Sequence, residues 1–144
     1  MLEVLVVVAI MGILATFIVI AYSKFNSMQA LDKNTALVSS VLNQARSLTL
    51  SSKGNTQYGV HFDTDGIVLF AGSSYVAGNP DNNSIALGSA VAVSVSLLGG
   101  ENDVIFERLT GKTGQSGSVT LSLISDPTSV KSLTIFGTGI IQNN

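Results

Sequence analysis

The spacing of hydrophobic and polar residues divides the chain into three stretches. In the first, from Val4 to Tyr22, no residue is charged, and Gly12 and Thr16 are the only weakly polar positions. A bilayer core needs roughly 20 apolar residues in a helix, and a helix satisfies its own backbone groups in lipid. Residues 1–24 are therefore predicted to form a hydrophobic anchor helix.

A cleaved secretory signal is the alternative reading of the same stretch. A signal would have a cationic segment in front, a shorter apolar core and an A-x-A-like cleavage site. The stretch has none of these features, and the helical pattern continues past Tyr22. The pattern therefore favours an anchor.

In the second stretch, apolar residues recur at three- and four-residue steps, with charged and amide side chains between them. The apolar positions are Phe25, Met28, Leu31, Val38, Val41, Leu42, Ala45 and Leu48. This spacing predicts an amphipathic helix over residues 25–53 whose stripe covers a core. No proline occurs before Pro80, so both halves are expected to form one helix of about 50 residues. The helix is predicted to end at "SSKGN", with Lys53 in the last turn and Gly54 as the C-cap.

In the third stretch, from Gln57 onward, the period becomes two. "QYGVHF" places Tyr58, Val60 and Phe62 on one face and His61 on the other, and "DTDG" provides a turn before "IVLFAG". "GNPDNNS" is predicted to be a polar loop. Four further alternating segments follow: "AVAVSVSL", "DVIFERL", "SVTLSLI" and "VKSLTIF".

Residues 54–144 are therefore expected to form a head with an antiparallel sheet of about six short strands. Such a sheet must bury its apolar face against another element. The stripe from Val38 to Leu48 is the long apolar helix face available. The predicted fold class is α+β, with one long N-terminal helix packed on an antiparallel β-sheet head.

Composition excludes several classes of function. Charged residues make up 11% of the chain, against about 25% in an ordinary soluble domain, and the net charge is −2. Beyond Lys53 the cations are Arg108, Lys112 and Lys131, which form no basic stripe for nucleic acid. With no cysteine and with His61 as the single histidine, the common nucleophilic constellations cannot be built. Neither an enzyme nor a cofactor is expected.

Two short motifs have simple structural explanations. "TGKT" at residues 110–113 resembles the end of a phosphate loop, but Phe106 stands where a glycine is needed, and a strand-like segment follows. Asp63, Asp65 and "NPDNN" offer hard oxygen ligands for calcium. Turn chemistry accounts for the same residues, so no metal site is predicted.

The order of elements resembles a known family. A glutamate, an apolar run containing "AIMGILA", a long helix and a β-rich head are similar to the type IV pilins and the type II secretion pseudopilins. The head segments "QARSLTL", "VIFERLTGKTGQSGSVTLSL" and "SLTIFGTGIIQ" resemble the H-type pseudopilins and the FimT-like minor pilins. The resemblance implies a structural subunit of a type IV pilus-like filament, a homo-oligomer that polymerises through its hydrophobic helix. A minor pseudopilin of a type II secretion system and a monomeric membrane-anchored envelope binding protein remain alternatives.

The resemblance also implies processing and location. In this family a prepilin peptidase removes a leader, and the new N-terminal residue is methylated. Glu3 would be the glutamate that the family has at the fifth mature position, so a leader and about two mature residues are expected to be missing from this numbering. The precursor is expected in the inner membrane with the assembly machinery as a partner, and the filament at the cell surface. The family often has a proline near the position of Ile20, and this chain has none. Local loosening of the helix is therefore expected only between Gly12 and Thr16.

Glu3 is the candidate subunit-assembly residue. An ionised carboxylate at bilayer depth costs several kcal/mol unless it is paired, and the nearest cation in the sequence is Lys24. The expected partner is the α-amine of its own chain or of the next subunit. The alternative is a glutamate at the membrane interface, favoured by the helix dipole. Packing between helices in the filament core is assigned to Val4, Val8, Gly12, Thr16 and Phe17.

Overall fold

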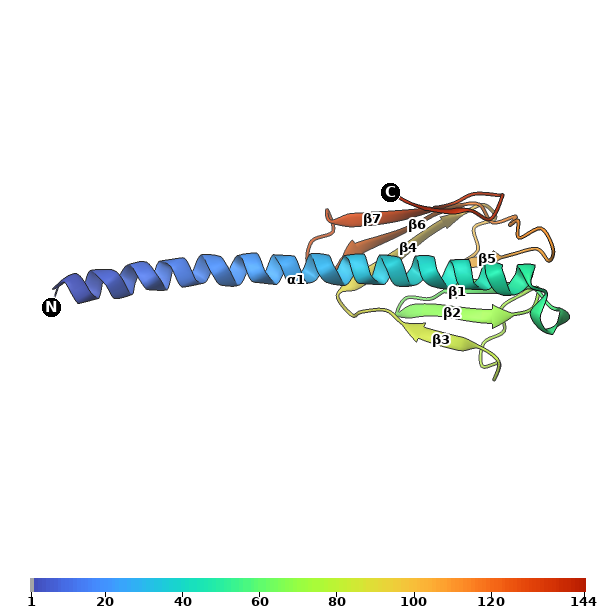
Figure 1. Cartoon of the computed structure of the whole chain (residues 1–144), viewed down its shortest axis with the longest axis horizontal. Helices are drawn as coiled ribbons and strands as arrows, with labels where there is room; N and C mark the ends of the chain where they lie inside the picture. Colours follow the sequence, from blue (N-terminus) through green and yellow to red (C-terminus); the bar gives the residue numbers. More distant parts are fainter. Residues whose placement is uncertain (1) are drawn as a thin grey trace.

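The computed structural model describes residues 2–144, and the side chains of residues 17–21 lie outside this description. Helix α1 runs without a break from Leu2 to Leu50, and its N-terminal half projects far beyond the head, as Figure 1 shows. The prediction of one long helix is confirmed. Its C-terminal end comes earlier than predicted, because Ser52 takes a left-handed φ of 49° and a short 3-10 helix, η1 (Lys53–Asn55), follows.

The head consists of two four-stranded antiparallel sheets that lie on either side of α1 (Figure 1). The first sheet has the order β3-β2-β1-β5, and the second has the order β4-β6-β7-β8. The strands are β1 (Tyr58–Phe62), β2 (Gly66–Ala71), β3 (Asn83–Ala86), β4 (Val91–Leu97), β5 (Asp103–Ile105), β6 (Gly117–Leu123), β7 (Val130–Ile135) and β8 (Ile141–Asn143).

The expectation of one sheet with about six strands is wrong in number and arrangement, although the α+β class is confirmed. Strand β3 begins inside the segment predicted as a polar loop, and its pairing with β2 joins Ile85 to Ile67. Strand β8 pairs with the end of β7, where Ile141 lies opposite Ile135. Both are short edge strands with largely exposed side chains. Backbone pairing, rather than alternation of apolar residues, therefore defines them.

The core lies between α1 and the inner faces of both sheets. On α1, the predicted stripe is confirmed where Val38, Val41, Leu42 and Ala45 are at most 4% exposed. Leu48 is half-buried and packs against this core. The strands add Val60, Phe62, Ile67, Leu69, Val104, Val119, Leu121, Leu133 and Ile135 to the same cluster.

The expectation that Phe25 and Met28 belong to the covered stripe is wrong. Phe25 is 60% exposed and Met28 is 41% exposed, whereas Leu31, one turn later, is 2% exposed. The strands of the head reach α1 only from about this point, so the apolar stripe extends further toward the N-terminus than the head that covers it. Two apolar side chains are therefore left on the surface where the helix emerges.

Two buried polar side chains fasten α1 to the head. The Asn34 amide donates to the carbonyl of Ala30 (2.7 Å), and its oxygen accepts from the backbone N–H of Gly88 (2.9 Å). The hydroxyl of Thr49 accepts from the N–H of Tyr58 (2.9 Å), at the start of β1. Because buried polar groups cost free energy unless they are hydrogen-bonded, these contacts fix where the chain leaves α1 and where it returns to it.

Candidate assembly surface

The projecting part of α1 exposes its apolar side chains on every side. Across residues 2–16, the exposed fractions of the large apolar residues run from 49% at Val6 to 76% at Leu2. Soluble monomers rarely expose contiguous apolar patches larger than a few hundred Å², and larger ones mark interaction sites. This segment is therefore the candidate functional surface of the chain.

The residues predicted to pack in a filament core all lie on this projecting segment. Val4 and Val8 are 66% and 62% exposed, and a Cβ placed on Gly12 would meet no atom within 4 Å. The hydroxyl of Thr16 donates to the carbonyl of Ile13 (2.7 Å). The side chain of Phe17 lies outside the described residues. A glycine inside a helix costs about 1 kcal/mol relative to alanine, and packing within the chain supplies no reason for Gly12.

Glu3 lies in the first turn of α1, where a carboxylate interacts favourably with the helix dipole. Within residues 2–144, Lys131 pairs with Asp32 and His61 contacts Asp103, so Glu3 takes part in neither contact. Lys24 stands about 32 Å further along the same helix at 1.5 Å per residue. The predicted pairing of Glu3 with an α-amine involves groups outside the described residues and stays a prediction. In the part of the chain that the structure describes, no helix has both the length and the apolarity needed to cross a membrane.

A groove of about 500 Å³ lies where α1 emerges from the head. It is formed by Ser23, Lys24, Ser27 and Met28 on the helix and by the turn between β6 and β7. In this turn, Asp126 accepts hydrogen bonds from the hydroxyls of Thr128 (2.6 Å) and Ser129 (2.9 Å). These hydrogen bonds, with a smaller contribution from the charge of Lys24, hold the pKa of Asp126 below its usual range.

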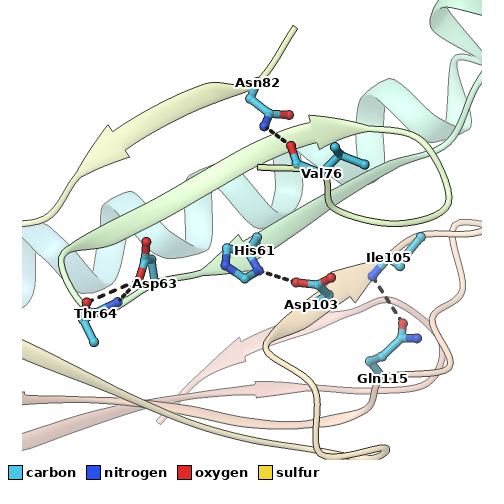
Figure 2. Close-up of polar contacts among 8 residues, drawn as sticks. All are labelled: His61, Asp63, Thr64, Val76, Asn82, Asp103, Ile105 and Gln115. Atoms are coloured by element: carbon cyan, nitrogen blue, oxygen red, sulfur yellow. Dashed lines mark hydrogen bonds and ion pairs between the residues drawn. The ribbon is translucent and has the colours of Figure 1, made fainter. Parts of the chain in front are cut away.

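A second polar cluster covers the outer face of the first sheet. His61 lies on β1 opposite the Val60 and Phe62 face, as predicted, and its Nδ1 is 2.5 Å from a carboxylate oxygen of Asp103 on β5 (Figure 2). The ring of Tyr75 stacks on the imidazole with centroids 3.9 Å apart. The sequence carries no signal for this cluster, because the β1–β5 pairing and the fold of the β2–β3 loop bring its members together.

This cluster holds the loop between β2 and β3 in place. Its geometry does not pair His61 with a hydroxyl nucleophile, because Ser84, the hydroxyl residue in the same cross-strand row, is separated from His61 by Val68 on β2. The loop that carries Tyr75 is closed by a hydrogen bond from the Asn82 amide to the carbonyl of Val76 (2.8 Å), also drawn in Figure 2. Tyr75 in turn covers Phe70 edge-on.

The turn predicted at Asp63 is present, and "TGKT" closes a loop. The carboxylate of Asp63 accepts from the backbone N–H of Thr64 (2.7 Å), and the Asp63 N–H donates to the carbonyl of Gly66 (2.9 Å). In "TGKT", Gly111 has a left-handed φ of 61° and its N–H donates to the carbonyl of Glu107 (2.9 Å). This segment closes a loop, whereas a phosphate loop would lead into a helix.

A long N-terminal helix, half projecting and half covered by antiparallel sheets, is the fold of the type IV pilins, and this chain has it. The crystal structure of the type IV minor pilin FimU from Pseudomonas aeruginosa (strain PAO1) is similar, with a TM-score of 0.58 and 14% sequence identity. The similarity covers 79% of this chain and 92% of that chain. No protein-family model and no curated protein matches the sequence. At this level of identity the likeness shows the fold.

Proposed function

We propose that this chain is a structural subunit of a type IV pilus-like filament and that it polymerises through the projecting half of α1. The observation that carries the proposal is the exposed apolar surface of residues 2–16 on a pilin fold. Side-by-side packing of such helices, with heads outside, buries that surface. Glu3 is the one acidic residue before Asp32, and it serves as the residue that sets the position of each subunit.

Before assembly, the uncharged stretch from Val4 to Tyr22 holds the subunit in the inner membrane, and the head lies on the far side. A prepilin peptidase and a methylating activity act on the N-terminal region of the precursor. Support for this part of the proposal comes from the sequence pattern and its family resemblance. The assembled filament then extends from the cell surface.

Electron microscopy of sheared surface material tests the proposal directly. Cells expressing the chain together with type IV pilus assembly proteins are expected to yield filaments that contain this subunit, identified by mass spectrometry. Deletion of its gene removes them or changes their composition. Sheared material without the subunit, when the chain is present in the membrane at normal levels, would refute the filament role.

A low-abundance subunit is the second candidate, because the similar crystal structure is that of a minor pilin. The two roles differ in stoichiometry. A major subunit makes up nearly all the protein of purified filaments, whereas a minor one is present at a few copies per filament. Quantitative mass spectrometry of the same sheared material separates them.

A further inference from the structure

Four segments that are distant in the sequence meet at the end of the head farthest from the N-terminus. They are the last turns of α1, η1, the β5–β6 loop and the β7–β8 turn (Figure 1). The Nε of Arg46 donates to the carbonyl of Gly111 (3.3 Å), and Gly139 lies so close to this carbonyl that it leaves no room for a Cβ. Arg108 donates to the side-chain oxygen of Asn55 (2.6 Å). The distal surface consists of the exposed parts of residues 46–55, 107–112 and 136–140.

The distal surface holds four of the seven Lys and Arg residues of the chain. They are Arg46, Lys53, Arg108 and Lys112. In the described part of the chain none of the four takes part in an ion pair, and Lys53 and Lys112 are exposed. The acidic residue of these segments is Glu107, whose carboxylate accepts a hydrogen bond from the hydroxyl of Thr110 (3.2 Å). The surface is therefore positive on a chain whose net charge is −2, and charge complementarity selects an anionic partner.

Leu109 stands at the tip of the β5–β6 loop, among these cations. It is 77% exposed, slightly more than Leu2 at the free end of α1. Two hydrogen bonds close the loop around it, from the N–H of Glu107 to the carbonyl of Lys112 (2.8 Å) and from the N–H of Gly111 to the carbonyl of Glu107 (2.9 Å). The backbone of Leu109 has a left-handed φ of 67°, which is unfavourable for a leucine. Glycine adopts this conformation without steric cost, so folding alone gives no reason for a leucine at this position.

Further apolar side chains are exposed on the same surface. Leu50, Phe136 and Ile140 are 41%, 43% and 55% exposed. Apolar side chains flanked by lysines and arginines are typical of proteins that bind anionic membranes, because the cations interact with phosphate groups and the apolar side chains enter the headgroup region. Nucleic acid is also anionic, but its bases stack on aromatic rings, whereas the residue at the loop tip is aliphatic.

We propose that the distal surface binds an anionic phospholipid membrane. Leu109 inserts at the level of the headgroups, and Lys53 and Lys112 lie beside phosphate groups. Arg108 positions the loop, since its hydrogen bond to Asn55 holds the loop against η1. Such binding requires no polymerisation, so it goes beyond the filament role.

The length of α1 determines which membrane the distal surface can reach. From Tyr22 to Leu50 the helix extends about 42 Å at 1.5 Å per residue, and the distal surface lies at the far end of this stretch (Figure 1). With the uncharged stretch embedded in a membrane, as proposed above, the distal surface faces away from that membrane. The membrane that it binds is then a different one.

Vesicle flotation tests the binding. The full chain is kept in solution by a non-ionic amphipathic polymer that covers the projecting helix, and is mixed with vesicles of phosphatidylcholine alone or of equal parts phosphatidylcholine and phosphatidylglycerol. We expect about tenfold more binding to the anionic vesicles. Lys112→Glu and Leu109→Ser should each reduce this binding to the level of the neutral vesicles. The matched controls, Lys33→Glu and Ile124→Ser, change exposed residues at the opposite end of the head and should bind normally. Equal binding of the unmodified chain to both kinds of vesicle would overturn the proposal.

Fluorescence tests the insertion of the loop tip. Because the chain has no tryptophan, Leu109→Trp introduces a single reporter. Its emission is expected to shift to shorter wavelength with the anionic vesicles and to stay unchanged with the neutral ones, whereas Ile124→Trp should shift with neither. An unshifted emission from Leu109→Trp in the presence of bound anionic vesicles would exclude insertion and overturn the proposal.

Leu109→Gly separates binding from folding. Glycine takes the left-handed conformation without steric cost, so the melting temperature should not fall, while binding to the anionic vesicles should. Normal vesicle binding by Leu109→Gly would contradict the role of the leucine. Binding of the chain to DNA that Lys112→Glu abolishes and Leu109→Ser leaves intact would assign the distal surface to nucleic acid and overturn its assignment to a membrane.

Discussion

Leu42 is the residue whose truncation most directly tests the packing of the head. Its side chain is fully buried on the stripe of α1, beside Val38 and Ala45, and belongs to the single core cluster formed with both sheets. Leu42→Ala removes three carbon atoms from a space enclosed on two sides by hydrogen-bonded strands. Since these strands cannot move inward without breaking their pairing, the cavity stays largely open.

The expected loss of folding free energy follows from this geometry. Buried leucine-to-alanine substitutions cost about 2–5 kcal/mol, and the cost rises with the volume of the remaining cavity. For Leu42 we expect about 3–4 kcal/mol. In a domain of this size such a loss lowers the melting temperature by roughly 10 °C or more.

The assay is a reversible thermal or denaturant melt of a head fragment that starts at Ser27. This fragment keeps Leu31, the first core residue of α1, and omits the projecting apolar segment. Leu98→Ala is the matched control, because Leu98 is 68% exposed and surface substitutions change stability by about 0.5 kcal/mol or less. A melting temperature for Leu42→Ala equal to that of the control would refute the packing argument.

Four further outcomes are expected. The head fragment that starts at Ser27 should be a soluble monomer by light scattering; polymerisation of this fragment into native-like filaments would exclude assembly through the projecting helix. Glu3→Ala should reduce sheared filaments at matched membrane levels of the subunit while the head stays folded, with Glu3→Gln intermediate; normal yield from Glu3→Ala would support the interfacial role instead. Gly12→Ala should stabilise the helix of the single chain by about 1 kcal/mol. It should nevertheless reduce filament yield, because the added methyl group keeps neighbouring helices apart. Unchanged yield would count against close packing of helices at Gly12. The pKa of Asp126 is lowered chiefly by the hydrogen bond from the Thr128 hydroxyl, so the ionised carboxylate contributes stability that is present above its unfolded pKa and is lost as the pH falls through its folded pKa. Asp126→Asn should therefore make the melting temperature less dependent on pH below about 4. An unchanged acid dependence would exclude this contribution.

The position of the groove shows how an accurate sequence pattern can still mislead. The periodicity from Phe25 to Leu48 correctly predicts one continuous helix with an apolar stripe, because the side-chain spacing of a helix is a local property. How much of that stripe the head covers depends on strands far away in the sequence. The head covers the stripe only from Leu31. Phe25 and Met28 are therefore exposed, and Met28 lines the groove, although the sequence pattern alone assigns both residues to the core.

The sequence by itself determined the long helix, the α+β class, the buried stripe from Val38 to Ala45, and the strands whose apolar residues alternate. These features follow from periodicity, which each segment carries within itself. Only the tertiary structure decided that the strands divide into two sheets, that β5 joins the edge of β1, and that His61 meets Asp103. Strand pairing is set by hydrogen bonds between backbone segments that are distant in the sequence. Such pairing produces no alternation of apolar and polar residues within β3 or β8 from which these strands could be predicted. The open groove beside Lys24 depends on the same pairing, because the turn between β6 and β7 forms its second wall.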